Sequence, residues 1–111
     1  MAAYIPRQGD IIAVTFDPQA GHEQKGRRPA LVVSQDLFNS STGLAIVCLI
    51  TNTDRGSPFH VPVPAASSLT GFVMVEQVKS IDFQARRIKR IEPRNEALLS
   101  EVLAILDACI Y

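Results

Sequence analysis

The chain has 111 residues, 47% of them apolar, so it can bury a core as one domain spanning residues 1–111. Eleven basic and eleven acidic residues cancel. Net charge therefore does not argue for a nucleic-acid partner, although two local clusters of cations permit one. No apolar run reaches the roughly 18 residues of a membrane span, and the N-terminus lacks a signal-peptide pattern. We therefore expect a cytoplasmic protein with no membrane partner.

Two short apolar runs in the first third of the chain predict β-strands. Ile11–Phe16 follows Gly9-Asp10 and ends at Asp17-Pro18, and the two-residue period of a strand puts Ile12, Val14 and Phe16 on one face. Ala30–Ser34 is almost continuously apolar, which indicates burial on both of its faces.

The middle of the chain predicts one helical turn and the strongest strand. Asp36–Asn39 is expected to form the turn, with Ser34 or Asp36 as its N-cap, and a turn at Ser41–Gly43 follows. Leu44–Ile50 is long and apolar, so we expect it to lie in the centre of the sheet.

Four weaker segments complete the predicted sheet. Pro62 lies within the first of them, which favours an edge position for that strand. The second and third are separated by the polar run Glu76–Ser80, and the fourth alternates polar and apolar residues. The segments are Phe59–Val63, Phe72–Val75, Ile81–Asp82 and Arg87–Ile91.

The last element is predicted to be a helix over Pro93–Cys109, because proline suits the first helical position and Glu96 the first turn. Its apolar residues form two adjacent stripes, which together are wider than a small sheet needs and favour an additional subunit interface. The stripes are Leu98, Val102, Ile105, Cys109 and Leu99, Leu103, Leu106, Ile110. Short antiparallel strands followed by a helix indicate a mainly β, α+β fold: a small, partly closed β-barrel with a C-terminal α-helix.

Cys48 and Cys109 are the only cysteines and lack the spacing of a zinc site. We expect buried thiols in a reducing compartment, with a metal pair or a disulfide as alternatives. The sequence also lacks nucleotide-binding and hydrolase motifs, so no metal and no cofactor is predicted. His22 and His60 are far apart, and His60 is expected to be a surface or hydrogen-bonded strand residue.

The polar segment from Gly21 to Pro29, between the first two strands, is suited to binding a polyanion. It holds Glu23, Gln24, Lys25 and the pair Arg27-Arg28. Together with Thr51, at the end of the central strand, these residues suit metal-free RNA cleavage, in which the 2′-hydroxyl attacks the adjacent phosphate. A guanidinium matches phosphate geometry and stays cationic, and a hydroxyl can donate a further hydrogen bond.

The order of these motifs resembles the MazF/PemK family of toxin endoribonucleases from bacterial toxin–antitoxin modules. The resemblance covers nearly the whole chain, and the Glu-Gln-x-Gly-x-Arg-Pro element is its most specific part. It rests on Gly9-Asp10-Ile11, Phe16-Asp17-Pro18, Gly21 to Pro29, Phe38-Asn39, Ile50-Thr51 and Glu76 to Asp82.

The resemblance implies an SH3-like barrel that forms a homodimer and cleaves single-stranded RNA at a short sequence without metal. The expected products carry a 2′,3′-cyclic phosphate or 3′-phosphate and a 5′-hydroxyl. The family's catalytic arginine and threonine fall on Arg28 and Thr51, and its loop carboxylate falls on Glu23. Glu23 is a candidate general base or orienting group, or else a structural ion-pair partner of a neighbouring arginine.

Several members carry a Pro-Cys-Thr-Thr type sequence where this chain has Leu49-Ile50-Thr51-Asn52. Thr51 is retained, but Asn52 changes its neighbour, which leaves the base preference open. The predicted RNA contacts are Phe16, Gln24, Lys25, Arg27, Asn52, Arg55, Gln77, Lys79 and Arg86. Phe16 could instead be a core residue. The cations from Arg86 to Arg90 could instead protect a solvated edge strand.

A toxin implies an antidote, and the resemblance predicts an acidic, partly disordered, MazE-like antitoxin that competes with RNA for the same cations. Two other functions remain open. The same fold hosts a non-catalytic toxin family that poisons gyrase, and a plain RNA-binding barrel would bind RNA without cleaving it.

Overall fold

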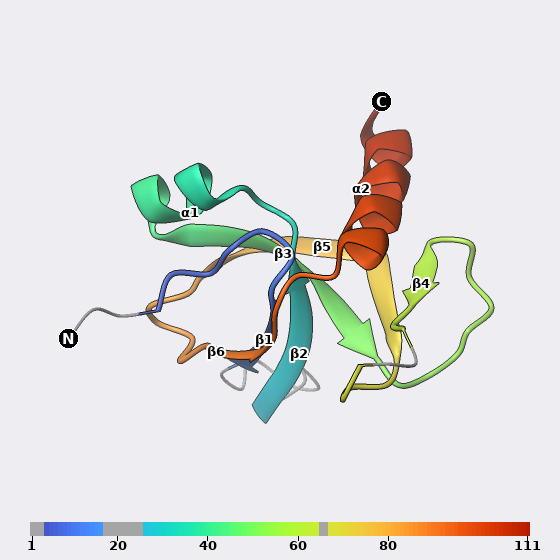
Figure 1. The fold of residues 1–111 in the computed structure, drawn as a ribbon, viewed down its shortest axis with the longest axis horizontal. Coiled ribbons are helices and arrows are strands. Elements are labelled where there is room, and N and C mark those ends of the chain that lie inside the picture. Colours follow the sequence, from blue (N-terminus) through green and yellow to red (C-terminus); the bar gives the residue numbers. More distant parts are fainter. Residues whose placement is uncertain (1–3, 17–25, 65–66) are drawn as a thin grey trace, which may run out of the picture.

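The described part of the chain forms a six-stranded antiparallel sheet with one long and one short helix (Figure 1). The structure is a computed structural model that describes residues 4–16, 26–64 and 67–111. The sheet order is β4-β5-β3-β2-β1-β6. Its strands are β1 Ile11–Phe16, β2 Gly26–Val32, β3 Leu44–Thr51, β4 His60–Pro62, β5 Phe72–Asp82 and β6 Lys89–Glu92.

The sheet confirms the central place of β3 and the edge position of β4, whereas several predicted boundaries are wrong. β6 begins at Lys89 and not at Arg87. β2 begins at Gly26 and not at Ala30, so Arg27 and Arg28 belong to a strand and not to a loop. β5 runs without a break through the polar run Glu76–Ser80, which the sequence analysis assigned to a connection. Those five residues are exposed, and four of them are polar. The segment therefore lacks the apolar alternation that predicts a strand.

β5 contains a large irregularity beside the end of β3. Cys48 pairs with Val78 and Ile50 with Val73, so residues 74–77 of β5 lie against the single residue Leu49 of β3. Such a bulge bends the strand and redirects its side chains. β4 pairs with β5 on the other side of this region.

The sheet has an apolar core on each face. The first core lies between the sheet and the long helix α2 (Glu96–Ile110) and includes Ile11, Leu31, Cys48, Ile50, Val73, Leu98 and Val102. The second core includes Ile12, Val14, Ala30, Val32, Val47 and Ile81 and is covered by Phe83, Ile88 and Tyr4. Because the central strands are covered on both sides, Ala30–Val33 is buried, as the sequence predicts.

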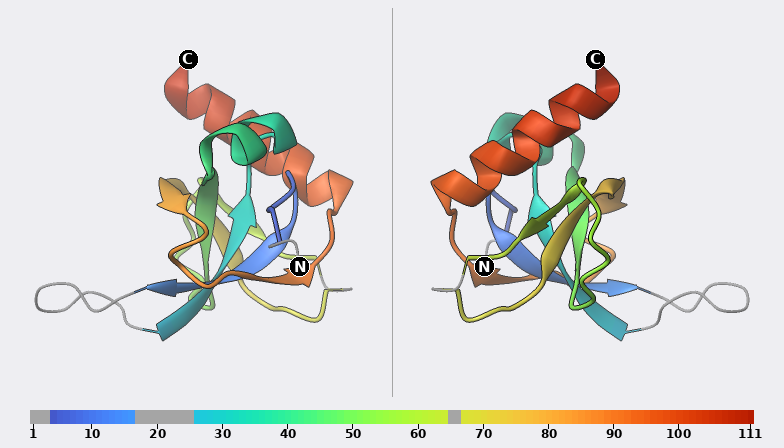
Figure 2. Two further views of the ribbon diagram at one scale, coloured as in Figure 1. Left: turned by 90° about the vertical axis from the view of Figure 1, so that its left-hand side faces the viewer. Right: turned by 90° about the vertical axis from the view of Figure 1, so that its right-hand side faces the viewer.

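Helix α2 begins at Glu96 and not at Pro93. The side chain of Asn95 accepts a hydrogen bond from the Leu98 N–H and so caps the first turn. Leu98, Leu99 and Val102 are buried, but the helix then rises clear of the strands (Figure 2) and Ile110 is 65% exposed. Cys109 is exposed as well, so the expected burial of its thiol is wrong.

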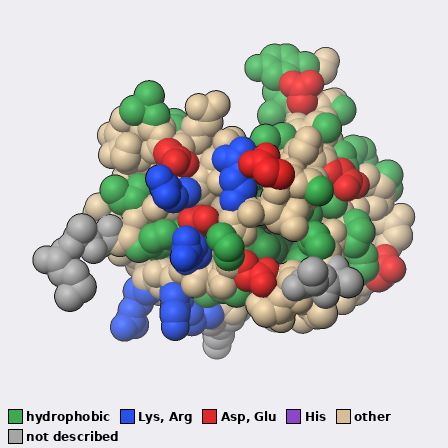
Figure 3. All heavy atoms as spheres, viewed as in Figure 1, with side chains coloured by type: hydrophobic (Ala, Val, Ile, Leu, Met, Phe, Trp, Pro, Cys, Tyr) green, Lys and Arg blue, Asp and Glu red, His purple; other side chains and the backbone are tan. Residues whose placement is uncertain are grey.

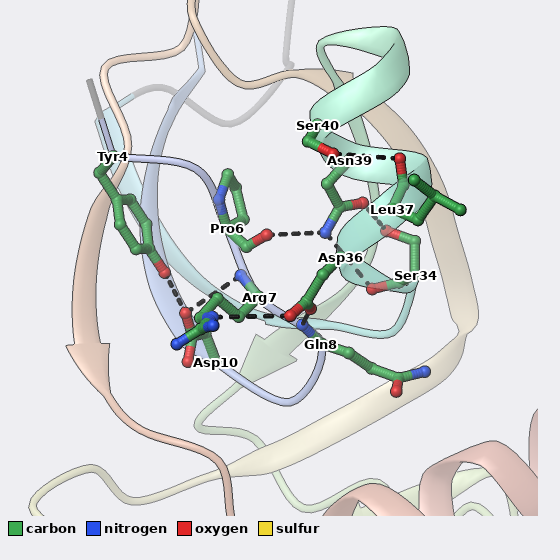
Figure 4. Close-up of polar contacts among 10 residues, drawn as sticks. All are labelled: Tyr4, Pro6, Arg7, Gln8, Asp10, Ser34, Asp36, Leu37, Asn39 and Ser40. Carbon is green, nitrogen blue, oxygen red and sulfur yellow. Dashed lines mark hydrogen bonds and ion pairs between the residues drawn. The ribbon is translucent and has the colours of Figure 1, made fainter. Parts of the chain in front are cut away.

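The short helix α1 (Asp36–Thr42) is tied to the N-terminal segment through a buried asparagine (Figure 4). The Asn39 amide donates to the Pro6 carbonyl at 2.8 Å and accepts from the Ser34 hydroxyl. Ser34 Oγ also accepts from the Ile46 N–H at 2.8 Å. The N-cap is Gln35 and its side chain makes no capping bond, so neither Ser34 nor Asp36 caps this helix.

These features match the expected mainly β, α+β class: a bent, partly closed antiparallel sheet with a C-terminal helix, although the sheet does not close into a full barrel. Neither helix in the described ranges has the length and apolar character that crossing a membrane requires.

Candidate nuclease site

Arg28 and Thr51 leave the sheet on the same face. The β2–β3 ladder ends at the pair Ala30–Leu49, and Arg28 and Thr51 are the residues two positions beyond it on their strands. Because strand side chains alternate, both residues share the face of Ala30, which is the face of the second core. β2 and β3 diverge beyond the end of their ladder (Figure 1).

The backbone of Arg28 is paired within the sheet. It pairs with Val14 of β1, and the following Pro29 pairs with Ala13. Its guanidinium makes no hydrogen bond or ion pair with any group in the described ranges, and the residue is only partly exposed. A guanidinium at such a position is suited to receiving a phosphate.

Thr51 ends β3 in a tight backbone environment. Its hydroxyl oxygen accepts a hydrogen bond from the Thr53 N–H at 3.2 Å, which leaves the hydroxyl hydrogen able to donate elsewhere. Gly71 has a φ of +138° and packs against this strand end, where a Cβ atom would lie 2.6 Å from the Thr51 carbonyl oxygen. Only glycine fits there without moving the Thr51 backbone.

The β5 bulge brings further polar residues to this end of the sheet. Gln77 lies in the bulge and is exposed. Lys79 pairs with Val47, so it projects from the face of the second core, the face that also carries Arg28 and Thr51. Asn52 and Arg55 are exposed in the connection that follows Thr51.

A contact between a buried histidine side chain and a partly exposed glutamate lies next to the bulge, and no pattern in the sequence indicates it. His60 Nε2 lies 2.9 Å from Glu76 Oε2, and the His60 side chain is only 4% exposed. The buried Nδ1 of His60 has no hydrogen-bond partner among the described residues. His60 is thus a hydrogen-bonded strand residue, as expected, although only one of its ring nitrogens is bonded within the described ranges. The partner lies 16 positions away and is found only through the β4–β5 pairing.

Glu76 is held in its ionised form by this arrangement. Partial burial raises the pKa of Glu76, but the hydrogen bond from His60, its own amide N–H and the positive charges of His60 and Arg55 together lower that pKa below its ordinary value.

Arg27 has a structural role, which the sequence analysis missed. Its Nη1 donates to the Thr15 hydroxyl at 2.6 Å and to the Arg87 carbonyl at 2.7 Å. Strand alternation sends this side chain to the face opposite that of Arg28. The carbonyl of Arg86, another predicted RNA contact, accepts from the Thr15 N–H at 2.9 Å.

Part of the predicted site belongs to the segment between β1 and β2. Glu23, Gln24, Lys25 and His22 lie outside the described residues, and the side chain of Phe16 is also not described. Cys48 offers no alternative chemistry, because burial, reinforced by the charge of Glu76, raises the pKa of its thiol to about 12 and keeps it protonated at neutral pH.

Residues 7–110 match the family model described as PemK-like, MazF-like toxin of type II toxin-antitoxin system. The chain is 41% identical over 86 residues to the endoribonuclease toxin MazF of Escherichia coli strain K12, covering 78% of this chain and 77% of that protein. It is also 41% identical over 108 residues to the endoribonuclease toxin ChpB of the same strain, covering 93% and 92%.

Two solved structures from Deinococcus radiodurans have the same fold. A MazF structure superposes with a TM-score of 0.87 at 38% identity, covering 97% of this chain and 98% of that one. A MazE–MazF structure superposes with a TM-score of 0.90 at 38% identity, covering 97% of each chain.

Proposed function

Since the chain belongs to the PemK-like, MazF-like toxins of type II toxin–antitoxin systems, it is an endoribonuclease toxin, and we propose that Arg28 and Thr51 carry its chemistry. The proposed reaction is sequence-specific, metal-independent cleavage of single-stranded RNA. The main support is the shared face of Arg28 and Thr51 at the point where β2 and β3 part. Intracellular RNA as the substrate makes the cytoplasm the proposed place of action.

In the proposed reaction, the 2′-oxygen attacks the adjacent phosphorus and the 5′-oxygen leaves. The products are a 2′,3′-cyclic phosphate, or the 3′-phosphate that follows from it, and a 5′-hydroxyl. Arg28 neutralises the charge that grows on the phosphoryl oxygens and gives a proton to the leaving oxygen. Thr51 donates a hydrogen bond to a phosphoryl oxygen. Glu23 is the proposed base or the group that orients Arg28.

The proposed RNA-binding surface surrounds this pair. Asn52 and Arg55 follow Thr51, and Gln77 and Lys79 extend the surface along β5. Unstacked bases of single-stranded RNA can be read by such polar and guanidinium groups. The remaining proposed contacts are Phe16, Gln24, Lys25 and Arg86, while Arg27 contributes chiefly by holding the neighbouring turn.

We propose an acidic, MazE-like antitoxin as the natural inhibitor. An acidic segment that folds on binding would use the same cations as RNA, so the two ligands should compete. The MazE–MazF structure from Deinococcus radiodurans supports such a partner for this fold.

A homodimer is the proposed assembly, and its support is an apolar surface beside α1. Leu37 is 76% exposed and Phe38 is 38% exposed, and they line an open groove that continues to Ile46 and Leu103. The exposed last turns of α2 extend this surface, on which Ile110 is 65% exposed. Contiguous exposed apolar residues are typical of a protein interface.

The catalytic proposal is tested by Arg28→Ala and Thr51→Ala with a long single-stranded RNA. Each substitution should lower the rate of cleavage by about two orders of magnitude, because it removes one transition-state donor. The fold, followed by circular dichroism, should remain intact. Mapping of 5′-hydroxyl ends identifies the product, and cleavage should persist in excess EDTA.

Other outcomes distinguish the alternative functions. Full activity of the Arg28→Ala variant contradicts the catalytic assignment. Steeply salt-dependent binding that leaves the RNA intact indicates a plain RNA-binding protein. Absence of both binding and cleavage favours a toxin that acts on a protein target.

A further inference from the structure

The contact between His60 and Glu76 lies on the face of the sheet that carries the proposed catalytic pair. Thr51 pairs with Phe72 of β5, and His60 of β4 pairs with Met74, two residues further along β5. Paired residues of antiparallel strands share a face, and so do residues two apart in one strand. His60 therefore projects from the same face as Thr51, and the carboxylate that it contacts is on that side of the molecule.

His60 ties the β5 bulge to the edge strand β4. Its side chain is 4% exposed, and its Nε2 lies 2.9 Å from Glu76 Oε2. Glu76 belongs to the bulge, in which residues 74–77 lie against Leu49 alone and so lack one-to-one partners on β3. Because the regular β3 ladder does not hold this segment, the contact with a buried imidazole fixes the position of the carboxylate.

The Glu76 carboxylate is also accessible and ionised. Its side chain is 43% exposed. Partial burial raises the pKa of Glu76, but hydrogen bonds from His60 and from its own amide N–H help to bring that pKa below its ordinary value. An ionised carboxylate accepts hydrogen bonds and donates none, and its charge repels phosphate. It is therefore suited to a hydrogen-bond donor on a ligand and not to an RNA backbone.

Other carboxylates of the described surface face flexible cations. Figure 3 shows Asp and Glu side chains beside Lys and Arg side chains over the middle of one face. Arg7 pairs with Asp36 and Arg94 with Glu96, and in both pairs the carboxylate is more than half exposed. Glu76 differs, because its contact is with a buried ring from the neighbouring strand. A group held in this way keeps one geometry, as recognition of a single chemical group requires.

We propose that Glu76 reads a base beside the cleaved bond by accepting a hydrogen bond from its exocyclic amino group, and that His60 positions Glu76 for this contact. The inference rests on the proposed function, because it needs single-stranded RNA bound at Arg28 and Thr51. Unstacked bases present their Watson–Crick edges to side chains. Adenine, cytosine and guanine carry an amino group there, whereas uracil has none. We therefore expect uracil to be disfavoured at the position that Glu76 reads.

The test uses variants that separate the carboxylate from the residue that holds it. Glu76→Gln keeps the shape of the side chain but can donate as well as accept. His60→Leu removes the donor and leaves an apolar side chain in the buried position, and His60→Gln restores an N–H donor. Glu101→Gln removes one charge from an exposed position of α2 and is the matched control.

Each protein cleaves an RNA library that is randomised around the cleaved bond, and the 5′-hydroxyl ends are sequenced. Binding is measured with RNA whose scissile 2′-hydroxyl is replaced by hydrogen, in one form with the preferred base and in another with uracil in its place. Circular dichroism establishes that every variant is folded. The binding measurement reports base preference even where no cleavage occurs.

The unaltered protein should prefer an amino-bearing base over uracil at one position by about tenfold or more. Glu76→Gln and His60→Leu should lose most of that preference, and His60→Gln should regain part of it. On the preferred RNA, both losses should raise KM while kcat stays within about threefold, because Arg28 and Thr51 are unaltered. Glu101→Gln should match the unaltered protein.

Three results would overturn the inference. An unchanged base preference in Glu76→Gln would show that the carboxylate reads no base. A fall in kcat with the preference intact would make Glu76 part of the cleavage chemistry. Equal losses in Glu101→Gln would show that only net charge matters. Base-selective binding that depends on Glu76, without cleavage by the unaltered protein, would instead contradict the proposed function alone.

Discussion

Arg27 and Arg28 are neighbours in the sequence, yet strand alternation sends their side chains to opposite faces of β2. Arg28 shares the face of Ala30, whereas the side chain of Arg27 is bonded to Thr15 and to the turn at Arg87. A run of cations in a sequence is therefore not one surface. The sequence identifies the residues suited to phosphate, but the boundary of β2 decides which of them shares a face with the proposed catalytic residue Thr51.

Gly71 is expected to be a positioning residue for Thr51. Gly71→Ala forces a Cβ atom to within 2.6 Å of the Thr51 carbonyl oxygen and places a side chain at a φ of +138°. We expect cleavage of RNA to fall by at least tenfold, mainly through kcat, since the Thr51 hydroxyl is displaced while the basic RNA contacts remain. Steady-state kinetics on a defined RNA measure this split.

Gly56→Ala is the matched control for that substitution. Gly56 also has a positive φ, +64°, but a Cβ atom there would meet nothing within 4 Å. Its alanine variant should lose stability by about 1–2 kcal/mol from backbone strain alone and should keep its kcat. Equal effects of the two substitutions on kcat would contradict the proposal that Gly71 positions Thr51.

At the scale of elements, the sequence predicted the apolar strands well and the polar ones poorly. β1, β3 and the N-terminal half of β5 show clear apolar patterns. The C-terminal half of β5 is exposed along residues 76–80, so its strand character comes from pairing with β3, which no local pattern reveals. The His60–Glu76 pair was missed for the same reason, because it depends on how β4 meets β5.

The start of α2 shows a competition between two local signals. Proline at the first helical position predicts a start at Pro93, but Asn95 caps the helix through its side chain. Pro93 lies instead in the connection after β6. That connection contains Arg94, whose side chain covers Gly9, since a Cβ atom on Gly9 would lie 2.6 Å from Arg94 Cγ.

Glu92, at the end of β6, should make stability depend on acid pH. Hydrogen bonds from the Ser67 hydroxyl and the Ser68 N–H lower the pKa of Glu92. A lowered folded pKa gives stability that is present above the unfolded pKa, about 4.3, and is lost as the pH falls through the folded value. Glu92→Gln should therefore lower Tm at neutral pH and have little effect in strong acid.

Thermal unfolding of the unaltered protein and of the Glu92→Gln variant, from neutral pH to strong acid, measures this difference in Tm. Ser68→Ala serves as a comparison, because it removes a hydroxyl bonded to Glu92 at 2.9 Å but leaves the backbone bond at 2.8 Å. It should show a smaller loss with the same pH trend. A Tm difference for Glu92→Gln that stays constant down to strong acid would contradict the assignment.

For the whole molecule, the proposed dimer surface gives a test with an internal control. Phe38→Glu places a charge in the apolar groove beside α1, where Phe38 is 38% exposed. An unpaired charge buried in an interface costs about 3–5 kcal/mol, so dimerisation should weaken by at least about two orders of magnitude. Phe59→Glu alters a phenylalanine of similar exposure, 44%, in the connection before β4. Sedimentation should show monomers only for Phe38→Glu, and dimers in both variants would exclude this surface.

The two cores share their strands, and this affects how the protein folds and unfolds. β2 gives Leu31 to one core and Ala30 to the other, and β5 gives Val73 to one and Ile81 to the other. Neither side can melt while its opposite stays intact, since the same backbone supports both. Folding is then an all-or-none event. A cell that produces this nuclease would contain folded, active molecules and unfolded chains that proteases can degrade, with few partly folded intermediates.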